Sequence, residues 1–126
     1  MTENQIAKIA FDCALKVHKA LGPGLLESAY TECLCYEIYK SGLYVEKEKP
    51  MPLQYGEIKL DTGYRTDIIV ENKFIIEVKS VEEVHDIHLA QLLTYLKLSG
   101  CKLGFLINFN VILLKDGLRR VINGTL

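Results

Sequence analysis

The chain has 126 residues, of which 49% are hydrophobic and 25% are charged, and its net charge is -1. This balance is typical of one ordinary globular domain of usual size. A chain of this length buries roughly two thirds of its unfolded surface, so its fold needs neither disulfides nor a structural metal. The near-neutral charge excludes a strong overall field for a polyanion, and any nucleic-acid contact has to rely on a local patch.

The N-terminal residues, Met1 to Gln5, lack the basic and apolar blocks of a secretory signal, and no apolar run approaches the ~20 residues of a membrane span. We therefore expect a cytoplasmic protein without a membrane contact. The cysteines have neither the spacing of a zinc site nor the density of a secreted disulfide scaffold, and we expect reduced core thiols. They are Cys13, Cys33, Cys35 and Cys101.

Two helices are predicted in the first third of the chain. Thr2 and Gln5 have the spacing of a capping box, and apolar residues then recur at helical spacing. These residues are Ile6, Ile9, Ala10, Cys13, Ala14, Val17 and Leu21. The Gly22-Pro23-Gly24 segment ends this helix, and a second helix is expected from Leu25 to Lys40, closed by Ser41-Gly42.

From Leu43 onward the pattern indicates strands separated by Pro and Gly. Three short strands are expected at Tyr44 to Glu48, Pro52 to Tyr55 and Glu57 to Leu60. A stronger pair, Tyr64 to Val70 and Phe74 to Lys79, flanks three residues that suit a tight hairpin loop.

The last third begins with a helix that is apolar almost all round, His85 to Ser99, which we expect to be largely buried and to end at Gly100. Leu103 to Phe109 is expected to be a buried strand. Val111 to Lys115 and Leu118 to Ile122 then flank Asp116-Gly117, the dipeptide of a two-residue hairpin turn. This order predicts one α/β (α+β) domain over residues 1–126, with helices flanking a central mixed sheet.

The stronger hairpin carries the candidate chemistry. With a three-residue loop Val70 opposes Phe74, so Asp67 opposes Glu77, and two directly opposed carboxylates repel unless a cation lies between them. Lys79 shares their face because side chains alternate along a strand. Magnesium prefers oxygen ligands and keeps several waters, so these carboxylates would hold it; one water becomes the nucleophile, while Lys79 orients it or offsets charge in the transition state.

Asp67 followed by a hairpin and Glu77-Val78-Lys79 resembles the motif of the PD-(D/E)XK nuclease superfamily, with Thr66 in place of the leading Pro. Gln91 and Tyr95, four apart on a helix, resemble the Q-x-x-x-Y motif of its RecB-like branch.

The segment from Gly24 to Tyr30 resembles the signature of the GxxExxY protein family, assigned to the same superfamily. Further segments continue the likeness over the whole chain: Val17-His18, Leu21 to Gly24, Leu106 to Phe109 and Lys115 to Gly117. The resemblance implies a restriction-endonuclease-like core, with Glu27 completing the metal carboxylates beside Asp67 and Glu77.

Each of these residues also has a structural explanation. The charged strand face of Asp67, Glu77 and Lys79 could be a solvated surface with cross-strand ion pairing. Glu27 could interact with its helix N-terminus, a contact worth about 0.3 to 1 kcal/mol. Gln91 and Tyr95 could satisfy buried polar partners. Within the motif set, we expect Gln91 and Tyr95 to support Lys79 or the phosphate.

Other polar residues are expected to be structural. Tyr30 is assigned to packing or to support of the site, and His18 to a packed helix, not to the metal. His85 and His88 have a spacing that permits a shared metal, but a solvent-exposed helix start is preferred. A further set offers a weak basic edge for DNA: Lys8, Lys16 and Lys19.

The sequence therefore predicts a Mg²⁺- or Mn²⁺-dependent nuclease that hydrolyses DNA, in preference to RNA, by attack of a metal-activated water. The alternative is a catalytically silent nuclease-fold module that binds nucleic acid or a protein. A weaker alternative is hydrolysis of another phosphate-containing substrate at the same site. Exposed edge strands would also permit a homodimer.

Overall fold

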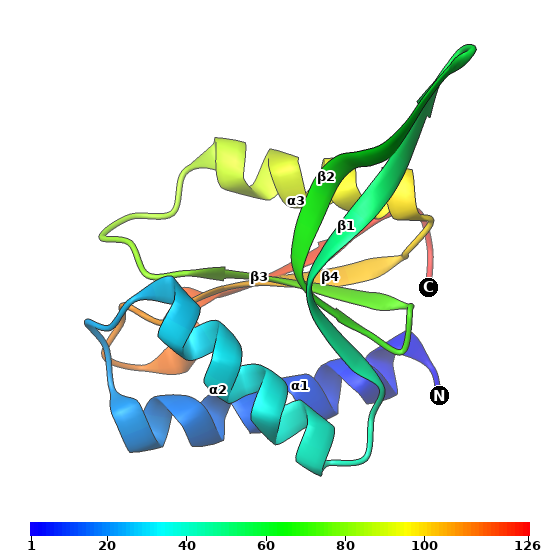
Figure 1. Cartoon of the computed structure of the whole chain (residues 1–126). Helices are drawn as coiled ribbons and strands as arrows, with labels where there is room; N and C mark the ends of the chain where they lie inside the picture. The colour runs from blue at the N-terminus through cyan, green and yellow to red at the C-terminus, as the bar shows by residue number, and fades with distance from the viewer.

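A five-stranded sheet lies at the centre of the computed structural model, which describes residues 1–126 (Figure 1). The strand order is β1-β2-β3-β4-β5, and only β3 and β4 are parallel. Helices α1 and α2 cover one face and α3 covers the other. The elements are α1 (Glu3–Leu21), α2 (Glu27–Lys40), β1 (Val45–Tyr55), β2 (Ile58–Val70), β3 (Phe74–Lys79), α3 (Asp86–Ser99), β4 (Leu103–Asn108), a 3₁₀ helix η1 (Leu114–Gly117) and β5 (Leu118–Ile122). The α/β prediction of a mixed sheet flanked by helices is confirmed.

Helix α1 begins with the predicted capping box. Thr2 N donates to the side-chain oxygen of Gln5, and Gln5 N donates to the side-chain oxygen of Thr2. It ends at Gly22, whose φ of 71° suits a residue without a side chain. Helix α2 begins at Glu27, two residues later than predicted, because Leu26 has an extended backbone and acts as the cap. Both helices bury an apolar stripe against the sheet.

Strands β1 and β2 replace the short separate strands that were predicted over residues 44–60. Proline does not interrupt β1 because β1 is an edge strand, where a missing amide donor is tolerated. The pairing shifts register between Met51 and Leu53, and beyond this point the two strands form an arm that projects past the helices (Figure 1). The arm was not foreseen from the sequence.

Helix α3 connects the parallel strands β3 and β4, an arrangement that requires a crossover. The prediction that this helix is largely buried is wrong. Only Leu92 and Leu96 are buried, whereas Ile87 is 70% exposed. Strand β4 is buried throughout, as predicted.

The chain after β4 differs from the predicted hairpin. Residues 111–113 form no strand, and Asp116-Gly117 belongs to η1 instead of a two-residue turn. Strand β5 pairs with β4, so the partner of Leu118–Ile122 is a more distant segment than expected. Gly117 does not adopt a positive φ; it is required because a side chain would overlap the backbone carbonyl of Asn108.

We expect Gly117→Ala to lower the free energy of unfolding by about 2 kcal/mol or more, because overpacking against backbone forces a shift of the chain. Urea denaturation measures this change. The neighbouring exposed substitution Asp116→Ala is the control and should change stability by less than about 0.5 kcal/mol. Equal stability of the Gly117→Ala variant and the wild type would contradict the close approach.

The sheet separates two apolar clusters, and its alternation decides where the polar residues point. Ile68, Ile76 and Val78 belong to the larger cluster under α1 and α2. Ile69 and Ile75 belong to the smaller cluster under α3. Since side chains alternate along a strand, the odd-numbered residues that follow Ile75 on β3 project toward the α3 face.

Candidate active site

Asp67 and Glu77 lie side by side where β2 and β3 stop pairing. The backbone ladder follows the predicted register from Val70 opposite Phe74 to Ile68 opposite Ile76. Beyond it, Glu77 Oε2 accepts a hydrogen bond from Asp67 N at 3.0 Å, and Asp67 Oδ2 accepts one from Val78 N at 2.8 Å. The two carboxylates thus take the place of backbone acceptors, and each keeps one oxygen that accepts no hydrogen bond within the protein.

Burial makes this pair costly to ionise. Glu77 is only 4% exposed, and burial together with the charge of Asp67 raises its pKa from 4.5 to about 8. Burial also raises the pKa of Asp67, although the hydrogen bond from Val78 N and the charge of Lys79 oppose this rise. A site that holds two acids in this way at neutral pH favours a cation between or beside them.

Lys79 is the last residue of β3 and lies next to Asn108 in the parallel register with β4. Its charge lowers the pKa of both Asp67 and Glu77, so its ammonium group acts on the pair. None of the four ion pairs in the structure includes Lys79. Lys79 is half-buried, and its ammonium group has no carboxylate partner in an ion pair.

Glu27 reaches the same region from the other face of the sheet. It is the first residue of α2, and its Oε2 accepts a hydrogen bond from Ser80 N at 3.3 Å, directly after β3. Its charge raises the pKa values of Asp67 and Glu77, which places its carboxylate in their electrostatic range.

Tyr30 fixes the loop that leads into α2. Its hydroxyl donates to Gly22 O at 2.5 Å and accepts from Leu25 N at 3.1 Å. Its fully buried ring stacks on Phe109 with centroids 4.5 Å apart. Tyr30 therefore packs and positions the start of α2, and Gly24, with a φ of 98°, supplies the turn before it.

We expect Tyr30→Phe to lower the free energy of unfolding by about 1 kcal/mol, since the ring packing remains and both hydroxyl hydrogen bonds are lost. Thermal denaturation followed by circular dichroism measures the loss. Tyr39→Phe is the matched control, because Tyr39 is exposed and its hydroxyl has no partner in the structure. An unchanged midpoint in the Tyr30→Phe variant would contradict the role of the hydroxyl.

Helix α3 brings Tyr95 to the carboxylates. Tyr95 is half-buried and stacks on Tyr64 of β2, with ring centroids 4.8 Å apart. Burial and the charges of Glu77 and Asp67 raise its pKa. Gln91 lies one turn earlier, is exposed and makes no hydrogen bond within the protein, so it does not satisfy a buried partner.

Residues 4–121 match the PD-(D/E)XK nuclease superfamily, with the Asp67 and Glu77-Val78-Lys79 motif inside the matched range. The chain belongs to this superfamily. No curated protein and no solved structure matches the chain. The mixed sheet flanked by helices is consistent with the restriction-endonuclease-like core of the superfamily.

The carboxylate oxygens of Asp67 and Glu77 are the kind of ligand that a divalent cation prefers. Asp67 and Glu77 each offer one free carboxylate oxygen, and hard cations such as Mg²⁺ prefer oxygen ligands. No three His, Cys, Asp or Glu side chains lie close enough together to form a complete metal site. Water and a phosphate oxygen supply the remaining ligands in sites of this kind.

Several residues around the superfamily motif were not singled out from the sequence. Glu48 lies in β1 between Lys47 and Lys49, whose partners in β2, Ile68 and Thr66, flank Asp67. Glu48 has a left-handed φ of 49°, and its charge raises the pKa of Asp67. Asn108 is 3% exposed and bonds the loop after β3. Asn108 lies in the segment Leu106 to Phe109, for which the sequence indicated a family resemblance but no role. Thr66, in the place of the motif Pro, is fully buried with an unpartnered hydroxyl.

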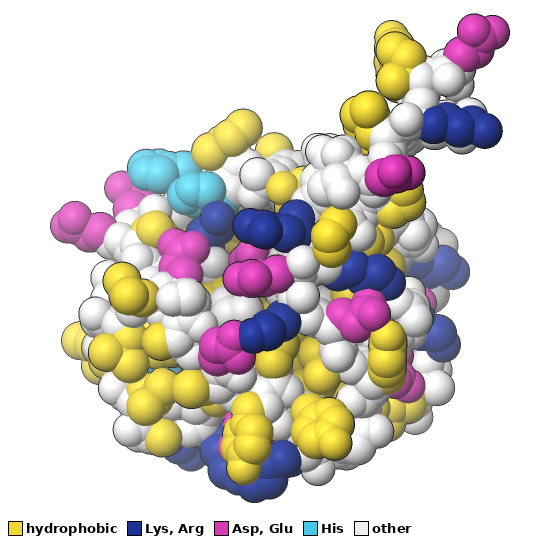
Figure 2. Space-filling model, in the orientation of Figure 1, with side chains coloured by type: hydrophobic (Ala, Val, Ile, Leu, Met, Phe, Trp, Pro, Cys, Tyr) yellow, Lys and Arg dark blue, Asp and Glu magenta, His cyan; other side chains and the backbone are white.

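His18 lies on a packed helix, and His85 and His88 lie at a helix start, as the sequence analysis expected. His18 is buried, and its Nε2 lies 2.8 Å from Val111 O. His88 Nδ1 accepts a hydrogen bond from His85 N at the start of α3. Figure 2 shows histidine side chains beside Asp and Glu side chains on one face of the protein. A surface hollow at the start of α3 is lined by Val81, Glu82, Glu83, His85 and His88.

Two of the three lysines that were considered as a basic edge for DNA lie in ion pairs. Lys8 pairs with Asp12 at 3.5 Å and Lys16 pairs with Glu37 at 3.2 Å. On the face in Figure 2, Lys, Arg, Asp and Glu side chains are interspersed. No helix has both the length and the apolar character needed to cross a bilayer.

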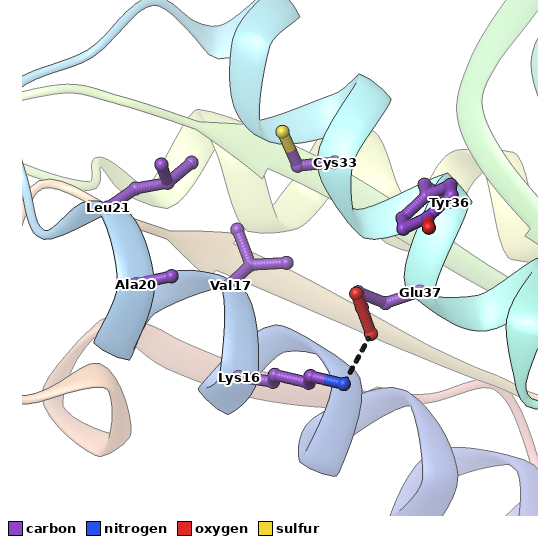
Figure 3. A pocket seen from close by; sticks show the side chains of 7 residues that line it. All are labelled: Lys16, Val17, Ala20, Leu21, Cys33, Tyr36 and Glu37. Carbon is purple, nitrogen blue, oxygen red and sulfur yellow. Dashed lines mark ion pairs between the residues drawn. The ribbon is translucent and has the colours of Figure 1, made fainter.

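An apolar cavity of about 200 Å³ lies between α1 and α2, away from the carboxylates (Figure 3). The Lys16–Glu37 ion pair crosses one end. The other lining residues are Val17, Ala20, Leu21, Cys33 and Tyr36.

All four cysteines of the chain are free; Cys13 and Cys101 are buried, and Cys33 and Cys35 are half-buried.

Proposed function

We propose that the protein is a divalent-metal-dependent nuclease of the RecB-like, GxxExxY type, which hydrolyses phosphodiester bonds of DNA in preference to RNA. The observation that carries the proposal is the Asp67–Glu77 pair at the end of the β2–β3 ladder, where each carboxylate has one free oxygen and Lys79 has no carboxylate partner. Superfamily membership supports nucleic acid as the substrate.

Asp67, Glu77 and Glu27 would hold the cation, Mg²⁺ or Mn²⁺. When bound, a divalent cation neutralises charge on a phosphate oxygen and lowers the pKa of water. In the reaction, water adds to phosphorus and loses a proton, while the P–O bond to the leaving oxygen breaks and that oxygen gains a proton. The carboxylates must be ionised for this role, and their raised pKa values make the site dependent on pH.

Lys79 binds the anionic part of the substrate in this proposal. Its ammonium group, free of ion pairs, donates a hydrogen bond to a phosphate oxygen or to the attacking water and offsets the negative charge that grows in the transition state. Tyr95 and Gln91 approach the substrate from α3. The exposed Gln91 amide would contact phosphate, and Tyr95 would hold the α3 side of the site through its stack on Tyr64.

The test is Mn²⁺-dependent cleavage of single- and double-stranded DNA and RNA by the wild type and by Glu77→Gln, purified in parallel. We expect the wild type to cleave DNA faster than RNA, and we expect EDTA or Glu77→Gln to abolish cleavage. Glu83→Gln removes an exposed carboxylate outside the site and should leave the rate unchanged. Cleavage that survives in Glu77→Gln would refute the assignment of the site.

A second candidate is a silent nuclease-fold module that binds nucleic acid or protein. The absence of three preassembled metal ligands favours it. Such a module would bind its partner equally well with EDTA or with Mn²⁺, and Mn²⁺ would not raise its melting temperature, because only a ligand that prefers the folded state stabilises a protein. Metal-dependent stabilisation together with cleavage would exclude this candidate.

A further inference from the structure

The two residues that follow Lys79 are held by two different elements of the fold. Ser80 contacts the start of α2, and Val81 contacts the end of β4. The backbone of Lys79 itself is fixed, because Phe109 N donates to Lys79 O at 2.9 Å. The chain that leaves β3 is therefore bonded at three consecutive residues.

Ser80 joins the strand of the motif to the helix that carries Glu27. Its hydroxyl donates to Leu25 O at 2.5 Å, and its amide donates to Glu27 Oε2 at 3.3 Å. These bonds connect positions more than fifty residues apart in the chain. They are the only hydrogen bonds of the Glu27 carboxylate and of the Leu25 carbonyl in the structure.

Asn108 holds the next residue. Its Oδ1 accepts from Val81 N at 3.1 Å, and its Nδ2 donates to Val81 O at 2.9 Å. Only one orientation of the amide satisfies both bonds. Asn108 is 3% exposed and lies opposite Lys79 in the parallel register, so a buried side chain holds the segment that Ser80 begins.

We propose that Ser80 is a positioning residue of the site, which orients the Glu27 carboxylate toward Asp67 and Glu77 through its amide and ties the start of α2 to β3 through its hydroxyl. This inference rests on the proposed function. It explains how an exposed glutamate at a helix start, which is otherwise free to sample many rotamers, keeps one orientation toward a pair on the other face of the sheet. Ser80 itself touches no reacting atom.

The hydroxyl can be removed without loss of the amide, and this provides the test. We expect Ser80→Ala to weaken Mn²⁺ binding by about 10-fold in calorimetric titration, the lower end of the effect of removing a residue that orients a metal ligand. Cleavage at saturating Mn²⁺ should stay within about two-fold of the wild-type rate, since the loss is in cation affinity and not in the reaction. Ser80→Thr keeps a hydroxyl and should restore the affinity.

Ser41→Ala is the matched control. The Ser41 hydroxyl also donates to a backbone carbonyl, that of Ile38, at 2.6 Å, but at the far end of α2. It should leave Mn²⁺ affinity unchanged even if it lowers the melting temperature. A Ser80→Ala variant that loses stability but binds Mn²⁺ as tightly as the wild type would assign Ser80 a structural role and overturn the proposal.

A double-mutant cycle tests whether Ser80 acts through Glu27. In the Glu27→Gln background, Ser80→Ala should cause little further loss of Mn²⁺ affinity. An equal loss in both backgrounds would overturn the proposal. Failure of the proposed function gives a different result from failure of the Ser80 proposal. If the proposed function is wrong, the wild type binds no Mn²⁺, or Glu77→Gln binds Mn²⁺ as tightly as the wild type.

Discussion

The Glu77→Gln variant is expected to be more stable than the wild type above pH 8, by a few kcal/mol, when divalent cations are absent. The pKa of Glu77 rises from 4.5 to about 8 on folding, chiefly through burial. The folded state therefore disfavours the charged form, and each pKa unit corresponds to about 1.4 kcal/mol. Glutamine has the same shape, can accept the hydrogen bond from Asp67 N and carries no charge.

The sign of this effect follows from proton linkage. A group with a raised pKa in the folded state favours folding fully below its unfolded pKa, and this contribution is lost as the pH rises toward the folded pKa. The wild type should therefore lose stability between pH 4.5 and about 8, and Glu77→Gln should lose less over this window. Urea denaturation in EDTA at pH 5 and pH 8.5 measures the difference.

Addition of Mn²⁺ at pH 8.5 should reverse the order, because a cation that binds the ionised pair stabilises only the wild type. Glu83→Gln, at an exposed position, should follow the wild type at every pH. If the wild type and Glu77→Gln were equally stable at pH 5 and pH 8.5 in EDTA, the Glu77 carboxylate would not be a strained, buried acid.

The Lys79→Met variant is expected to lose about 10²- to 10³-fold in kcat, the usual cost of removing one group that stabilises developing charge. Methionine keeps most of the length of the side chain and removes the charge. Because the Lys79 charge lowers the pKa values of Asp67 and Glu77, its loss should also move the onset of activity to higher pH. Rate measurements across pH test both effects.

Lys102→Met is the control for the loss of one positive charge, since Lys102 is exposed just before β4 and its ammonium group has no hydrogen bond or ion pair. It should leave kcat and the pH profile unchanged. A Lys79→Met variant that cleaves at the wild-type rate would remove Lys79 from the reaction and leave only a structural role for it.

The fold was predictable where local signals are strong. The capping box of Thr2 and the three-residue loop before Phe74 set helix α1 and the β2–β3 register, because both depend on residues close in the chain. The predictions failed where distant contacts decide. Strand β1 continues through its prolines because it lies at the edge of the sheet, and β5 pairs with β4 instead of residues 111–115.

The site was predictable to a similar extent. Alternation along β3 placed Glu77 and Lys79 on one face, and the hairpin placed Asp67 beside Glu77. Ser80 and Asn108 carry no such signal, because their roles arise from hydrogen bonds between segments 27 to 55 residues apart. Only the folded chain shows which polar residues support the motif.

Calorimetric titration of Mn²⁺ into the wild type and Glu77→Gln at pH 8.5 tests the central claim most directly, since it requires no knowledge of the substrate. We predict saturable binding to the wild type, with release of protons as the cation displaces them from the carboxylate pair, and no detectable binding to Glu77→Gln. Absence of binding to the wild type, or equal binding to both proteins, would show that Asp67 and Glu77 do not form a cation site.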